Sequence, residues 1–133
     1  MATVYKAVRL TEDERFTSAV VECTPYCLDY IIGQVTSPPV GTYIYAFDNP
    51  ASAETFGRYN CPGDFAVLEC EADIVDDPRP SYSVIYSEAV AIASWWASPE
   101  GRWTSRALPH SVWCRWARPV NVLKYFRRTG WDD

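Results

Sequence analysis

The chain has 133 residues, a length that suits a single domain, and 48% of them are hydrophobic, which is enough for a buried core. Its formal net charge of −5 argues against general binding to nucleic acid backbones. The sequence contains no apolar run of roughly 18 residues, the length that a membrane-spanning helix needs, so no membrane partner is expected.

The first elements are predicted to form a β-hairpin. Residues 3–10 are rich in β-forming side chains, and residues 16–22 return as a second arm after the charged turn 11–15. Residues 23–41 are expected to be mostly loop because proline and glycine recur there, with a short strand at 29–32.

A strand followed by a helix is predicted in the middle of the chain. Residues 42–48 alternate, and both faces carry apolar side chains, so this strand is placed at the centre of the sheet. Asn49 suits a helix N-cap and Pro50 suits the first helical position. The short helix is expected to end at 60–64.

Residues 65–75 predict a strand with one buried and one acidic, solvent-facing side. The buried side contains Ala66, Leu68, Cys70, Ala72 and Ile74, and the acidic side contains Glu69, Glu71 and Asp73. A second helix is predicted over 83–97 and a last strand over 111–126, followed by a polar tail at 127–133. The pattern predicts one α+β domain over residues 1–133, with a curved, mostly antiparallel sheet of about five to six strands and two helices.

Cations and aromatic rings interleave in the last third of the chain. Arginine binds phosphate or carboxylate groups through paired hydrogen bonds, and rings offer stacking surfaces. We therefore hypothesise a ligand surface on the loop 98–110 and the strand 111–118, although core packing and solvated charge would explain the same pattern. Tyr125, Phe126, Arg127 and Arg128 continue the pattern. The candidate ligand-binding residues are Arg102, Trp103, Arg106, Trp113, Arg115, Tyr43 and Tyr45.

Residues 41–74 also show a strand–helix–strand pattern marked by Gly41, Tyr43, Ser52, Ala53 and Phe56. This pattern locally resembles the ADP-ribosyltransferase fold, and the resemblance implies an NAD-using enzyme with Tyr43, Tyr45 and Glu69 or Glu71 at its site. The chain departs from the family because its single histidine, His110, comes late and no His-Gly motif precedes the segment. The order of elements further resembles small uncharacterised phage and prophage proteins, which implies an accessory binding role.

The cysteines and the histidine offer a second kind of site. Cys23 and Cys27 form one pair, and His110 and Cys114 form another, with a spacing that structural zinc uses. Cys114 lies on the apolar face of its predicted strand, where inert thiols are found, so we expect no bound metal. Whether the two pairs come together around a metal ion in the folded protein stays open. Without a secretory signal, the five cysteines are expected to be reduced thiols in a cytoplasmic protein.

The sequence therefore favours a binding module over an enzyme, since one histidine leaves few groups for acid–base catalysis. The expected partner is an anionic ligand, either a nucleotide-like small molecule or an acidic surface of a host protein, as a phage accessory or anti-defence factor would bind. No cofactor is expected. The alternatives are the NAD-using enzyme and a structural domain that forms homo-oligomers.

Overall fold

The computed structural model describes residues 1–19, 27–61, 63–75 and 110–127. These residues form, in chain order, β1 (Ala2–Leu10), β2 (Phe16–Ser18), β3 (Ile44–Phe47), α1 (Pro50–Asn60), β4 (Phe65–Val75) and β5 (Ser111–Phe126). The predicted α+β class is confirmed. The described residues contain one helix, so the prediction of two helices is not borne out. The second helix, predicted over 83–97, lies outside the described residues.

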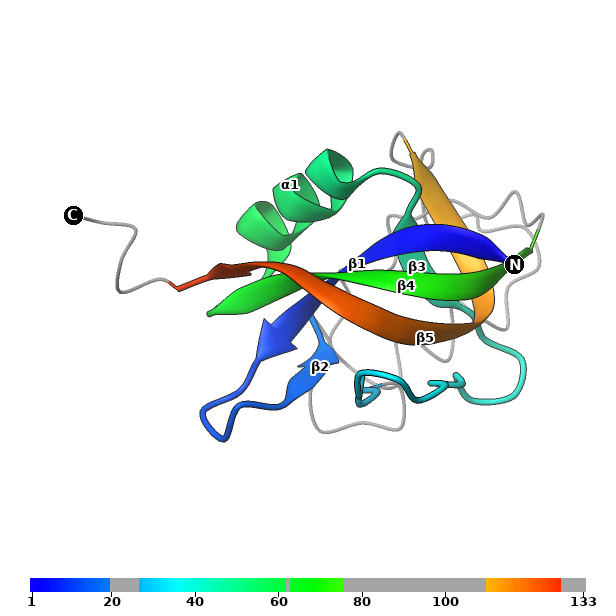
Figure 1. Cartoon of the computed structure of the whole chain (residues 1–133), viewed down its shortest axis with the longest axis horizontal. Helices are drawn as coiled ribbons and strands as arrows, with labels where there is room; N and C mark the ends of the chain where they lie inside the picture. Colours follow the sequence, from blue (N-terminus) through cyan, green and yellow to red (C-terminus); the bar gives the residue numbers. More distant parts are fainter. Residues whose placement is uncertain (20–26, 62, 76–109, 128–133) are drawn as a thin grey trace.

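The strands form one antiparallel sheet in the order β2-β1-β3-β5-β4. β3 lies in the middle of this order, as its alternating pattern predicted. β1 also pairs with β4, from Ala2 opposite Ala72 to Arg9 opposite Phe65, so the sheet closes on itself as a small barrel. Figure 1 shows β1, β4 and β5 side by side, with α1 lying across one side of them.

β5 wraps around this barrel because it contains three bulges. The register between β4 and β5 shifts three times, and each shift leaves one β5 residue without an opposite residue: Arg115, Val120 and Leu123. A bulge bends its strand and increases the local twist. The strands 65–75 and 111–126 begin and end where the sequence predicted, but the bulges and the closure were not predicted.

The start and end of α1 follow from local chemistry. The Asn49 side chain accepts a hydrogen bond from the backbone N–H of Ser52 at 2.9 Å, and Pro50 occupies the first turn, as predicted. The helix ends at Asn60, where the backbone N–H of Cys61 donates to the Gly57 carbonyl at 3.0 Å. Ala53, Phe56 and Gly57 are buried against the sheet.

Two buried clusters lie on the two faces of the sheet. The helix-side core, between α1 and the sheet, is rich in rings: Tyr45, Phe47, Phe56, Phe65, Trp113 and Phe126. The lumen of the barrel is filled by small and aliphatic side chains: Val4, Val8, Ile44, Ala46, Ala66, Leu68, Cys70, Ala72, Cys114 and Ala117.

The predicted faces of β4 are confirmed for most of its length. Leu68 and Cys70 are fully buried in the lumen. The prediction that Ile74 is buried was wrong, because this residue is 38% exposed and lies next to a bulge. Phe65 and Val67 are buried on the opposite face, because α1 covers that end of the strand.

Candidate functional site

The predicted aromatic ligand contacts that the structure describes lie in or against the core. Tyr45 and Trp113 are opposite each other on β3 and β5, each is 5% exposed, and their ring centroids are 5.1 Å apart. Tyr43 packs partly buried against the same cluster. The structure therefore places these three side chains in or against the helix-side core, where their rings pack on neighbouring side chains.

The predicted contact Arg115 and a second arginine of β5, Arg118, are engaged with the acidic face of β4. Arg115 donates to the Asp73 carboxylate at 3.1 Å, and Arg118 donates to the Glu71 carboxylate at 2.6 Å. Glu71 is one of the carboxylates that the transferase resemblance would place at a site. Arg102, Trp103 and Arg106 lie outside the described residues.

The candidate zinc ligands that the structure describes are in different surroundings. Cys114 is fully buried in the lumen, whereas His110 is exposed and its Nδ1 lies 2.9 Å from the Asp48 carboxylate. Cys27 is partly exposed, and Cys23 lies outside the described residues. Within the described ranges, no group of three or more potential ligands is close enough to hold a metal ion. No helix in these ranges is long and apolar enough to cross a membrane.

Sequence reasoning missed a buried lysine in the lumen. Lys6 donates from its Nζ to the Tyr45 carbonyl at 2.6 Å and lies 5.9 Å from the centroid of the Tyr30 ring. Burial lowers the pKa of Lys6 to about 8, and burial raises the pKa of Cys70 and of Cys114 to about 12. The sequence did indicate this position, because every second residue of a strand faces the same side, and Lys6 alternates with the apolar residues Val4 and Val8.

A hollow of about 540 Å³ lies between the β1–β2 turn, the start of β4 and the end of β5. It is called the turn hollow below, and it is lined by Arg9, Leu10, Thr11, Glu12, Glu14, Gly63, Asp64 and Arg127. Arg127 reaches Glu14 at 3.7 Å and Asp64 at 3.9 Å, both longer than a hydrogen bond. Arg9 is oriented by a 3.1 Å hydrogen bond from its guanidinium to the Ala19 carbonyl.

More cations and rings gather beside this hollow, at the end of β5. The Glu54 carboxylate lies between two cations, 3.6 Å from Arg58 Nε and 3.6 Å from Lys124 Nζ. Both cations lie near the face of Phe126, at 5.1 and 4.9 Å from its centroid, and Arg127 lies 5.8 Å from the centroid of Tyr125. In the described part of the chain, cations and rings thus interleave most densely here rather than at 113–115.

Comparisons of the chain with protein-family models, curated proteins and solved structures gave no match. The local resemblances to ADP-ribosyltransferases and to phage proteins therefore stay predictions. What the chain does has to be inferred from the geometry of its surface.

Proposed function

We propose that the protein is a non-enzymatic binding module for a small, nucleotide-like anionic ligand, which it holds in the turn hollow. The observation that carries this proposal is the position of Arg127. Its side chain is 48% exposed, and the two carboxylates beside it among the described residues lie beyond hydrogen-bond distance. A guanidinium in this position exchanges these loose contacts for paired hydrogen bonds to a phosphate group.

Arg127 is better placed for this exchange than Arg115 and Arg118 on β5. Arg115 and Arg118 already make hydrogen bonds of 3.1 and 2.6 Å to carboxylates. A ligand at those residues would have to break a charge-assisted hydrogen bond before forming its own. At Arg127 it displaces contacts of 3.7 and 3.9 Å instead.

The acidic lining narrows the class of ligand. Glu12, Glu14 and Asp64 also face the hollow, so a bare inorganic anion meets three carboxylates there. A nucleotide carries hydroxyl and amino groups in addition to its phosphates, and carboxylates accept hydrogen bonds from such donors. A mixed lining of arginines and carboxylates therefore favours a nucleotide-like ligand over inorganic phosphate.

Calorimetric titration with ADP tests the proposal. We expect wild-type protein to bind ADP more tightly than inorganic phosphate, and Arg127→Ala to weaken ADP binding about ten- to a hundredfold, the loss of one charge-assisted pair. Arg127→Lys is expected to restore part of the affinity, because an ammonium keeps the charge but loses the paired geometry.

Arg115→Ala is the matched control, since it removes an exposed arginine from the first part of β5, whereas Arg127 directly follows the end of this strand. It is expected to leave ADP binding unchanged. Absence of ADP binding by the wild-type protein would overturn the proposal. A loss caused by Arg115→Ala and not by Arg127→Ala would move the site to the acidic face of β4.

A further inference from the structure

An exposed aromatic ring lies beside the turn hollow. In the described part of the chain, the aromatic residues with exposed side chains are Tyr59 on α1 and Tyr125 on β5, at 84% and 49% exposure. The guanidinium carbon of Arg127, which lines the turn hollow, is 5.8 Å from the centroid of the Tyr125 ring. Tyr125 is therefore an exposed ring in contact with the residue that we assign to the phosphate group.

A second neighbour of the Tyr125 ring also leads to the wall of the turn hollow. The ring of Phe16 on β2 lies with its centroid 6.2 Å from that of Tyr125 and is tilted by 34°, within the usual range for paired rings. Phe16 is paired with Leu10 of β1, and Leu10 lines the turn hollow. Contacts along β5 and across to β2 thus both connect Tyr125 with residues of the hollow.

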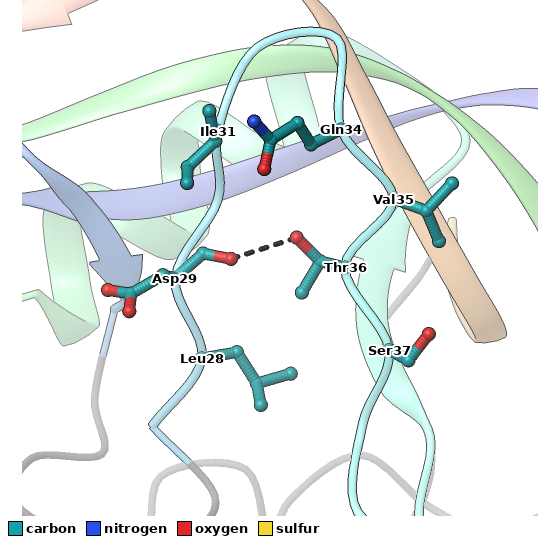
Figure 2. Close-up of a pocket in the computed structure, with 7 residues that line it drawn as sticks. All are labelled: Leu28, Asp29, Ile31, Gln34, Val35, Thr36 and Ser37. Atoms are coloured by element: carbon teal, nitrogen blue, oxygen red, sulfur yellow. Dashed lines mark hydrogen bonds between the residues drawn. The ribbon is translucent and has the colours of Figure 1, made fainter.

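Phe16 is held in place by residues 28–37, which form an arch with two arms. The backbone N–H of Tyr30, on the first arm, donates to the Phe16 carbonyl at 2.9 Å. Figure 2 shows the two arms side by side, joined by a hydrogen bond of 2.8 Å from the Thr36 hydroxyl to the Asp29 carbonyl. Since β2 is bonded to β1 on one edge and to the arch on the other, the ring that backs the tyrosine has a fixed backbone.

The backbone of Tyr125 is fixed as well. The next residue, Phe126, is 3% exposed and stacks on Phe65, with ring centroids 4.4 Å apart and ring planes 7° apart. Tyr125 is opposite Ala66 of β4 in the sheet, and Phe126 is opposite Phe65. A half-exposed ring on a fixed backbone is a preorganised stacking surface, so a ligand that stacks there loses little affinity to the ordering of the protein.

We propose that the base of the bound nucleotide stacks on the ring of Tyr125 while Arg127 holds its phosphate. This stacking rests on the proposed function, since it needs a nucleotide in the turn hollow. Every base has a π-face that stacks on an aromatic ring, and one ribose joins the base to the phosphates, so a single ligand reaches the neighbouring ring and guanidinium. The ligand class is thereby narrowed to nucleotides with an aromatic base, because a sugar phosphate or pyrophosphate has no ring to stack.

Calorimetric titration of tyrosine variants with ADP and with pyrophosphate, which lacks a base, tests this proposal. Tyr125→Ala is expected to weaken ADP binding about ten- to a hundredfold, the loss of one stacked base, and to leave pyrophosphate binding within about twofold of the wild type. Tyr125→Phe keeps the ring and is expected to bind ADP like the wild type. Arg127→Ala is expected to weaken the binding of both ligands, because it removes the phosphate contact.

Tyr59→Ala is the matched control, because it removes the other exposed tyrosine of the described residues, which lines a separate hollow on α1 with Phe47 and Phe56. It is expected to leave ADP binding unchanged. Unchanged ADP binding by Tyr125→Ala would overturn the stacking and leave the proposed function in place, whereas a wild type that binds no ADP would overturn both. Equal losses of ADP and pyrophosphate binding would also overturn the stacking, because the tyrosine would then only position Arg127.

Discussion

Lys6 is buried in the lumen, although an ammonium group loses its hydration there. Because burial lowers its pKa from 10.5 to about 8, the unfolded chain binds more protons than the folded protein between these pH values. Below about pH 8 the folded protein therefore bears the full free-energy cost of burying the charged ammonium group. The free energy of unfolding rises as the pH increases from 8 toward 10.5. The raised pKa of Cys70 and Cys114 has the opposite effect, which begins as the thiols of the unfolded chain start to ionise near their ordinary value of 9.0.

A comparison of the wild type with Lys6→Met isolates the lysine, because the two thiols contribute to both proteins. In urea unfolding between pH 8 and 9, the free energy of unfolding of the wild type is expected to rise relative to that of Lys6→Met. Lys124→Met is the control, since this lysine is exposed and its removal leaves the slope in place. Parallel profiles for wild type and Lys6→Met would show that the lysine is hydrated in the folded protein.

At the scale of the elements, α1 and β4 meet at Gly57. A methyl group added there would lie 2.3 Å from Cε2 of Phe65, which is fully buried and stacked on Phe126 at 4.4 Å. Alanine favours a helix over glycine by about 1 kcal/mol, but the overlap with a ring that cannot move outweighs this gain. We expect Gly57→Ala to destabilise the protein by about 1–3 kcal/mol in chemical denaturation. Thr55→Ala, on the exposed side of α1, should change stability by less than about 0.5 kcal/mol. A stabilised Gly57→Ala would contradict this close contact.

The elements that were predicted from the sequence depend on local signals. The Asn49–Pro50 helix start and the alternation of 65–75 involve neighbouring residues, so they were visible in the chain. The β1–β4 pairing and the three bulges of β5 depend on strands far apart in sequence, and no local pattern encodes them. Likewise, the exposure of Tyr45 and Trp113 could not be judged before the position of α1 was known, and this is why buried rings resembled a ligand surface.

At the scale of the whole molecule, closure of the barrel protects the thiols of its lumen. Cys70 and Cys114 are fully buried on β4 and β5, and the β1–β4 pairing closes the sheet around them, whereas Cys27 is partly exposed. A thiol reagent therefore reaches the two lumen cysteines only when the barrel opens. Mass spectrometry of labelled peptides is expected to show labelling of Cys70 and Cys114 about a hundredfold or more slower than that of Cys27.

The same experiment separates global from local opening. If the barrel opens only by global unfolding, Gly57→Ala accelerates the labelling of both lumen cysteines by the same factor, because it lowers the free energy of unfolding of the entire barrel. Under denaturing conditions all five cysteines of the chain should react, and a lower count would show that the expectation of reduced thiols is wrong. Fast labelling of Cys114 alone would contradict global opening. It would place local opening at the β3–β5 pairing, which extends only from Ser111 to Cys114 on β5.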